Sequence, residues 1–174
     1  MTNKILLHIC CGPCAVSVVE KLRAAGFELV GYFYNPNIQP QKEYFKRLAT
    51  AKKLAKIFDF KILEEKYQPD EHLEVTKNLE KPDRCLVCYQ LRLEKTAQKA
   101  TMLDIKYFTS TLLISPYQDL KKIRHISRRL AKKYQLEFFD QDFAKDFRAG
   151  HKKAHELGLY CQKYCGCLKS INER

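Results

Sequence analysis

The feature that most constrains the fold is an apolar segment that leads directly into three closely spaced cysteines. Residues 5–9 read Ile-Leu-Leu-His-Ile, and Cys10, Cys11 and Cys14 follow at once. The apolar run is too short for a helix and predicts a buried strand. Pro13 suits the first turn of a helix, where a missing N–H costs no hydrogen bond. The three thiols are therefore expected where a parallel strand ends and a helix begins, the sheet edge at which α/β proteins bind ligands.

The rest of the chain alternates between expected strands and helices. Further strands are predicted at residues 28–35, 60–63, 107–114 and 136–139. Helices are predicted over residues 15–25, 41–58, 70–78, 119–134 and a stretch opened by Cys85, and residues 143–163 read as mainly helical. We see no internal repeat or linker. This order predicts one α/β domain over residues 1–174: a doubly wound, mostly parallel five-stranded sheet with helices on both faces and a helical C-terminal segment.

The chain carries an excess of positive charge that no single tail accounts for. It has 32 Lys and Arg against 20 Asp and Glu, a formal net charge of +12. A positive field spread over a surface favours a polyanionic partner, with RNA or DNA as the first candidate. The alternative is a basic surface that only keeps the protein in solution.

Neither a secretory signal nor a membrane span is predicted. The apolar residues before the first cysteine are too few for the apolar region of a signal peptide, and no run of the sequence approaches the length of a transmembrane helix. We therefore expect a cytoplasmic protein, in which thiols stay reduced. The eight cysteines then favour metal ligands or redox groups over structural disulfides.

Two cysteine pairs have the spacing of a metal site. Cys10 and Cys11 are adjacent, so their side chains diverge and do not readily bridge each other. Cys85 and Cys88 are three residues apart at a helix start, which puts both sulfurs on one side of the first turn. Four thiolates suffice for a tetrahedral zinc ion or an iron–sulfur cubane. The alternative is that these cysteines are small core hydrophobes.

A further pair, Cys165 and Cys167, is separated by one glycine near the C-terminus. A disulfide between them would close a small, strained ring that is easily reduced, which suits a redox couple. The same pair equally suits two ligands of a second metal, and a C-terminal packing element is the third interpretation.

Cys11 and Cys14 also form a CxxC motif at a strand-to-helix junction, as in thioredoxin-like oxidoreductases. Three features oppose that interpretation: the chain has no Trp, the first strand carries the motif, and the other cysteine clusters would have no use.

Several segments together resemble the QueH-type epoxyqueuosine reductases, over nearly the whole length and in the same order. They are residues 8–14 (His-Ile-Cys-Cys-Gly-Pro-Cys), Tyr34-Asn35-Pro36-Asn37-Ile38 with Glu43, Tyr44 and Arg47, Arg84 to Cys88 with Arg92 and Leu93, residues 109–117, and residues 160–167. One departure is visible, because Cys161 stands before Gln162 where we expect the family's arginine. Cys161 therefore has no expected role.

The resemblance implies the last step of queuosine biosynthesis, in which the epoxide of epoxyqueuosine, already in the wobble position of a tRNA anticodon, is reduced to the cyclopentene. It implies a Rossmann-like fold of the HUP type and an electron donor that the sequence does not identify. For Cys165 and Cys167 it implies a redox-active disulfide pair or ligands of an additional iron. The cluster that it implies is [4Fe-4S], with these ligands: Cys10, Cys11, Cys85 and Cys88.

The chemistry of that reaction adds requirements. Removing the epoxide oxygen as water consumes two electrons and two protons, whereas a [4Fe-4S] centre passes electrons singly, so a second store is needed. In one interpretation, Cys165 and Cys167 form this second electron store as a dithiol. In the other, they are ligands of a metal ion that polarises the epoxide oxygen. By sequence position, the candidate proton donors are Asp140, Asp142, Asp146 and Tyr160.

Two further groups of residues are expected to bind the substrate. Side chains proposed to contact the modified base are Asn35, Asn37, Ser115, Tyr160 and Gln162. Side chains proposed to contact tRNA phosphates, without reading sequence, are Lys46, Arg47, Arg124, Arg128 and Lys132. Two other functions remain open at this point: a thioredoxin-like thiol oxidoreductase that uses Cys11 and Cys14, and a non-catalytic, zinc-stabilised RNA-binding module.

Overall fold

Strand β1 (Lys4–His8) is the centre of a five-stranded sheet because its Ile and Leu side chains are buried on both faces. The computed structural model describes residues 3–173. The strand order is β3-β2-β1-β4-β5, and every neighbouring pair is parallel. The other strands are β2 (Glu28–Phe33), β3 (Lys61–Glu64), β4 (Tyr107–Ser110) and β5 (Glu137–Phe138).

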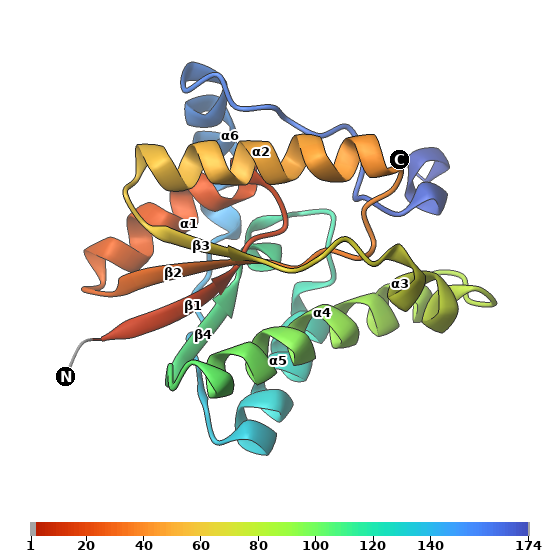
Figure 1. Ribbon diagram of the computed structural model, residues 1–174, viewed down its shortest axis with the longest axis horizontal. Helices are drawn as coiled ribbons and strands as arrows, with labels where there is room; N and C mark the ends of the chain where they lie inside the picture. The colour runs from red at the N-terminus through yellow and green to blue at the C-terminus, as the bar shows by residue number, and fades with distance from the viewer. Residues whose placement is uncertain (1–2, 174) are drawn as a thin grey trace.

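Helices cover both faces of this sheet (Figure 1). On one face α1 packs against both α2 and α6, and on the other α4 packs against α5, with α3 beside α4. The helices are α1 (Gly12–Ala24), α2 (Gln41–Ile57), α3 (Pro69–Thr76), α4 (Asp83–Met102), α5 (Leu120–Tyr134) and α6 (Phe147–Glu156). The predicted doubly wound α/β fold, with helices on both faces, is confirmed.

The direction of strand addition reverses between β1 and β4. After β1 the chain moves outward through β2 to β3, and then crosses back to place β4 on the other side of β1. The loops that follow β1 and β4 therefore leave the same sheet edge in opposite directions, which is where doubly wound folds bind ligands. The two loops are joined directly, since the Cys10 N–H donates to Thr111 Oγ1 at 2.9 Å.

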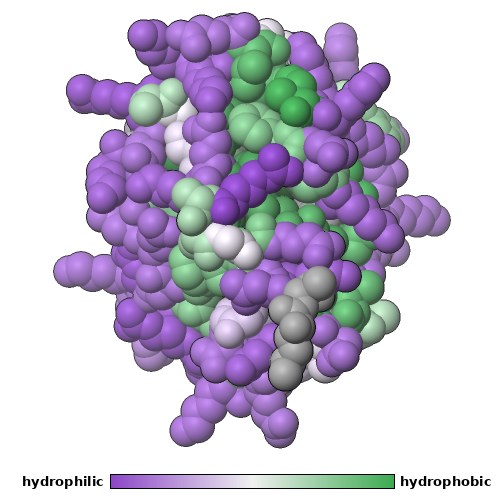
Figure 2. Space-filling view, turned by 90° about the vertical axis from the view of Figure 1, so that its left-hand side faces the viewer, coloured by the Kyte–Doolittle hydropathy of each residue, from purple (hydrophilic) through white to green (hydrophobic). Residues whose placement is uncertain are grey.

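At the opposite, amino edge of the sheet, the described residues form no comparable group of metal-ligating side chains. Figure 2 shows that face, on which a band of hydrophobic residues lies among hydrophilic ones. A cavity of about 400 Å³ at this edge is lined by residues that include Phe27, Leu29, Phe60 and Leu103, with no cysteine or histidine among them. Among the residues described, no helix is both long enough and apolar enough to cross a bilayer.

Two predicted elements are present but end earlier than expected. The strand expected over residues 107–114 ends at Ser110, because the Ser110 hydroxyl accepts a hydrogen bond from the Leu112 N–H and starts a 3-10 helix, η1 (Thr111–Ile114). The helix expected up to residue 163 ends at Glu156, where Gly158 adopts a positive φ of 62°. The segment after it has no regular structure until η3 (Leu168–Asn172).

The start of α1 lies so close to α2 that only glycine fits between Cys11 and Pro13. A Cβ on Gly12 would lie 2.5 Å from Thr50 Cγ2. We expect Gly12→Ala to destabilise the protein by about 1–3 kcal/mol through overpacking, measured by urea denaturation. Thr50→Ser removes Cγ2 but keeps the hydroxyl that donates to the Lys46 carbonyl. The double variant Gly12→Ala/Thr50→Ser should therefore recover most of the loss, and no recovery would contradict this packing.

Candidate functional site

Three thiols converge at the carboxyl end of β1. The sulfur atoms of Cys10, Cys11 and Cys14 all lie within 4.8 Å of one another, and in the part of the chain that the structure describes this is the one group of three potential metal-ligating side chains that is so close. Cys11 is the extended N-cap of α1, and Cys14 lies in its first turn. The turn thus brings the Cys14 sulfur back toward its neighbours, and this residue belongs to the site although the sequence suggested no metal-binding role for it.

Neighbouring polar groups give the three thiols unequal acidities. The Thr111 hydroxyl donates to Cys10 Sγ at 3.0 Å, and the Gln162 amide donates to Cys11 Sγ at 2.8 Å. Hydrogen bonds with Cys11 and Cys14, helped by the charge of Arg92, hold the pKa of Cys10 well below that of an ordinary thiol. Burial raises the pKa of Cys11, and the hydrogen bonds with Cys10 raise that of Cys14. The group therefore favours a single thiolate at Cys10 when no metal is bound.

These acidities oppose a thioredoxin-like mechanism. The nucleophilic cysteine of such a CxxC motif needs a lowered pKa and access to solvent. Cys11 and Cys14 are 1% and 4% exposed, and both have raised pKa values.

Four other cysteines form a second group. Cys85 and Cys88 lie in the first turn and a half of α4, and with Cys165 and Cys167 they line one small cavity of about 20 Å³. Burial raises the pKa of Cys88 to about 12 and also raises that of Cys85. Cys165 and Cys167 are thus placed beside Cys85 and Cys88 of α4, although the two segments are far apart in the sequence.

Arg92 lies between the two sulfur groups. Its side chain is 2% exposed; Nη2 donates to Asn35 Oδ1 at 2.7 Å, and Nη1 lies 3.9 Å from Cys88 Sγ. Burial disfavours the guanidinium charge, but Cys88, Cys10 and Cys165 raise its pKa above the usual value. No carboxylate of the described chain is found in an ion pair with it. A buried cation whose negative neighbours are sulfurs fits a site that holds thiolates or an anionic sulfur-ligated group.

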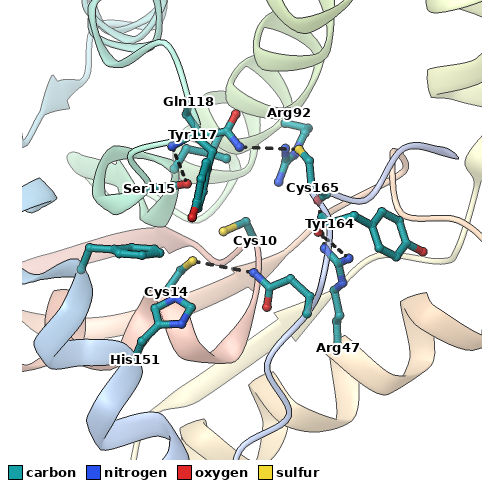
Figure 3. Close-up of a pocket in the computed structure, with 13 residues that line it drawn as sticks. Cys10, Cys14, Arg47, Arg92, Ser115, Tyr117, Gln118, His151, Tyr164 and Cys165 are labelled. Atoms are coloured by element: carbon teal, nitrogen blue, oxygen red, sulfur yellow. Dashed lines mark hydrogen bonds between the residues drawn. The ribbon is translucent and has the colours of Figure 1, made fainter. Parts of the chain in front are cut away.

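Two larger cavities meet at these sulfurs. One of about 260 Å³ is lined by Cys10, Cys14, Arg92 and Cys165 among others (Figure 3). The other, of about 620 Å³, is lined by Cys85, Cys165 and Cys167 among others. Cys165 lines both cavities, and so the two sulfur groups border a common space that is accessible from outside.

Gln118 fixes the side chain of Cys165 at this junction. Its amide nitrogen donates to Cys165 Sγ at 3.5 Å, and its amide oxygen accepts from the Tyr89 hydroxyl at 2.8 Å. Gln118 was not predicted from the sequence. Its position shortly after Pro116, at the carboxyl edge of the sheet, was the available signal.

The C-terminal segment is held in place by a residue assigned to a different role. Arg47 was expected to contact tRNA phosphate, but its side chain is 2% exposed and donates to the carbonyls of Tyr164 and Cys165 and to Glu43. That expectation is wrong because all the donor nitrogens are used inside the protein. Arg47 instead anchors the segment that carries Cys165.

The residues expected to contact the modified base have diverse environments. Asn35 is buried and its amide is fully engaged, since it accepts from Arg92 and donates to the Ile9 carbonyl. Asn37 is buried with both amide atoms unpartnered beside the small sulfur-lined cavity. Ser115 and Gln162 line the 260 Å³ cavity. The Tyr160 hydroxyl donates to Glu43 outside that cavity.

The candidate proton donors do not line either of the large cavities. Asp140 pairs with Arg124 and Arg128, and Asp146 pairs with Lys21. Asp142 accepts a hydrogen bond from the Ala144 N–H. These carboxylates therefore have structural partners away from the sulfurs.

The remaining candidates for phosphate contacts lie on the surface. Lys46 is exposed, with Nζ 3.9 Å from the centre of the Tyr160 ring. The Arg128 side chain is 67% exposed although it pairs with Asp140, and Lys132 is exposed. Arg124 is the least accessible of the four, because it is 23% exposed and bonded to Asp140.

Comparison with known proteins identifies relatives over almost the entire chain. The protein-family model described as epoxyqueuosine reductase QueH matches residues 5–173. The epoxyqueuosine reductase QueH of Thermotoga maritima is 36% identical over 179 residues, which cover 98% of this chain and 91% of that protein. The corresponding protein of Dehalococcoides mccartyi is 35% identical, with 100% and 96% covered, and that of Haemophilus influenzae is 36% identical, with 98% and 73% covered.

Solved structures with the same fold are more distant in sequence. The U34-tRNA thiolase NcsA from Methanococcus maripaludis, solved with its [4Fe-4S] cluster, superposes with a TM-score of 0.58 at 14% identity and covers 98% of this chain and 62% of its own. The zinc-inhibited form of the teicoplanin deacetylase Orf2 has a TM-score of 0.55 at 10% identity, with 88% and 83% covered. At these identities the likeness concerns the fold alone, and it confirms the expected Rossmann-like fold.

The acidities at the sulfur site predict a pH-dependent reactivity for the metal-free, reduced protein. Because the pKa of Cys10 is lowered, its thiolate forms as the pH rises through that lowered value, and iodoacetamide should modify Cys10 at a lower pH than Cys161, whose pKa burial raises. Arg92→Met removes a cation that favours the thiolate, so the Cys10 profile should move to higher pH while the Cys161 profile stays unchanged. Peptide mass spectrometry after alkylation measures both; an unmoved Cys10 profile would contradict the role of Arg92.

Proposed function

This chain belongs to the QueH family of epoxyqueuosine reductases, and from that premise we propose that it reduces epoxyqueuosine in the wobble position of a tRNA anticodon to queuosine. The observation that carries the proposal is the convergence of seven cysteines, from three separate parts of the chain, around the buried charge of Arg92. Such a donor set suits electron-transfer chemistry better than hydrolysis or nucleotide binding.

We propose that the chain holds a [4Fe-4S] cluster. The chemistry of the donor set fits, because thiolates are the usual ligands of such clusters and the cluster's negative charge would balance Arg92. The four ligands that we assign are Cys10, Cys11, Cys85 and Cys88. Both pairs lie near Arg92, since Cys88 contacts it and its charge lowers the pKa of Cys10. When bound, the cluster supplies electrons one at a time.

Cys165 and Cys167 are proposed to supply the second electron store. Oxidation of the two thiols to a disulfide releases two electrons and two protons, which match what the epoxide needs to become an alkene and water. Gln118 holds Cys165 at the junction of the two cavities, where a substrate can reach it. An external electron donor would then restore the dithiol. The alternative for this pair is to bind an additional iron that polarises the epoxide oxygen.

The substrate is proposed to be a complete tRNA, bound mainly through its phosphates. The formal charge of +12 and the exposed Lys46, Arg128 and Lys132 supply the attraction. The reactive nucleotide is unpaired in the anticodon loop, so it can be turned out toward the sulfurs.

The proposed function is tested by incubating anaerobically prepared protein with tRNA that contains epoxyqueuosine and a chemical reductant. We expect nucleoside mass spectrometry to show the loss of one oxygen atom from the modified base. Cys165→Ser should abolish this conversion, whereas Cys161→Ser should leave it unchanged because Cys161 lies outside both sulfur groups.

Iron content separates the two roles of the Cys165 pair. If the pair is a dithiol, Cys165→Ser keeps the wild-type amount of bound iron; if it ligates an additional iron, bound iron falls. Wild-type protein that binds zinc, lacks visible absorption and leaves the epoxide intact would contradict the proposed function.

Binding through phosphates predicts a measurable salt dependence. The slope of log affinity for tRNA against log salt concentration should become less steep in Lys132→Glu and in Lys46→Glu. We expect the slope to change by at least about 0.7 to 0.9 for every phosphate that the side chain neutralises. Lys106→Glu is the matched control, since Lys106 is exposed at the amino edge of the sheet, away from the sulfurs. Fluorescence anisotropy over a salt series gives the slopes, and slopes that match the wild type at Lys46 and Lys132 would place the RNA on another face.

A further inference from the structure

An exposed aromatic ring stands at the entrance to both sulfur-lined cavities. Tyr117 is 67% exposed and lines the 260 Å³ and the 620 Å³ cavities, each of which also contains Cys165. The turn after η1 places it there, with the Tyr117 N–H donating to Ser115 Oγ at 3.3 Å. Figure 3 shows the ring extending into the pocket toward Cys10, from the side opposite to His151.

Two further rings continue this aromatic surface. Phe147 meets Tyr117 edge to face, with ring centres 6.1 Å apart, and His151 lies 4.3 Å from Phe147. Phe147 and His151 both line the 260 Å³ cavity and come from successive turns of α6. Three rings from two separate segments therefore line the cavity that leads to Cys10 and Cys14.

The position of Tyr117 is not explained by the packing of the core. Two aromatic side chains are among the exposed large hydrophobic residues of the described chain. Tyr117 is 67% exposed and Phe45 is 50% exposed. A large ring left in water at the entrance of a cavity is typical of a ligand-binding surface. Nucleobases are the ligands that aromatic rings bind without reading sequence, because every base presents a π-face.

We propose that Tyr117, supported by Phe147 and His151, is the stacking site for the flat ring of the modified wobble base. This inference rests on the proposed function. The base and its epoxide-bearing ring are two parts of one nucleotide. The epoxide has to reach the half-buried Cys10 and Cys165 inside the cavities, so the flat base remains nearer the entrance, where Tyr117 stands.

The charges beside the three rings suit the rest of the nucleotide. Arg148 is exposed next to Phe147, and Lys121 and Lys122 are exposed at the start of α5, within five residues of Tyr117. These cations can neutralise the phosphates on either side of a base that is turned into the cavity. Stacking thereby fixes the base while the phosphate contacts fix the strand.

The test uses an anticodon stem-loop RNA with 2-aminopurine in the wobble position and the metal-loaded protein. Stacking on Tyr117 should quench the fluorescence of the probe when the RNA binds. Tyr117→Ala should abolish most of the quenching and weaken binding by about 5- to 150-fold, the range found when one aromatic ring is removed from beneath a stacked base. Tyr117→Phe should retain the quenching and the binding affinity, because the aromatic ring is preserved.

Two variants and one kinetic comparison exclude indirect effects. Phe45→Ala removes an exposed ring that does not line either sulfur cavity, and it should leave quenching and affinity unchanged. Tyr117→Leu keeps apolar volume without a ring, and it should behave like Tyr117→Ala. With epoxyqueuosine-containing tRNA, both Tyr117 variants should raise KM more than they lower kcat, because stacking is present in the bound substrate as well as in the transition state.

The results separate this inference from the proposed function. If the wild type reduces epoxyqueuosine in tRNA but Tyr117→Ala and Tyr117→Leu keep wild-type quenching and affinity, the stacking site is wrong and the function stands. If the wild type quenches the probe through Tyr117 but does not reduce the epoxide, the function is wrong and the stacking site stands. Equal iron content in all variants shows that the sulfur site is intact.

Discussion

The structure depends on the balance between one buried positive charge and the sulfurs around it. The Arg92 guanidinium is almost fully enclosed, and its negatively charged or ionisable neighbours are Cys88, Cys10 and Cys165. An isolated charge in that position would be strongly destabilising, so the surroundings have to supply an anion. The Cys10 thiolate supplies it in the metal-free protein, and a thiolate-ligated cluster would supply it in the loaded one.

The parallel topology explains how residues distant in the sequence reach this charge. Strands β1 and β4 are neighbours although about a hundred residues separate them, and their carboxyl ends present Cys10 and Thr111 to each other. Helix α4 starts at the same edge with Cys85 and Cys88. The final segment returns across α2, where Arg47 holds the backbone at Cys165. Each of the three cysteine-bearing regions is therefore placed by an independent set of contacts.

Much of this arrangement could be predicted from residue patterns. Short apolar runs identified all five strands. The signal is strongest in the three inner strands, β1, β2 and β4, whose residues are mostly buried, whereas the edge strands β3 and β5 are only partly buried. The ends of two elements were not predicted correctly, because a local hydrogen bond and a local backbone conformation determine them. A Ser110 cap turned the end of a predicted strand into a 3-10 helix, and Gly158 ended a helix early. Neither event alters the hydrophobic pattern.

The site was predicted less completely, because side-chain roles depend on tertiary contacts. The cysteine pairs were identified as ligands or redox groups from their spacing alone, and that assignment stays a prediction. Arg47 and Arg92 have the same charge and were indistinguishable by composition from surface arginines, yet both are buried and bonded within the protein. A cue existed for Arg92, which follows Cys88 by four residues on the same helix face.

The most direct test of this account is anomalous diffraction at the iron absorption edge from crystals of anaerobically prepared protein. The account predicts iron density at the carboxyl edge of the sheet, bonded to Cys10 and Cys11 on one side and to Cys85 and Cys88 on the other, next to Arg92. Iron bound to only one of these pairs, or a site that binds no iron, would contradict it.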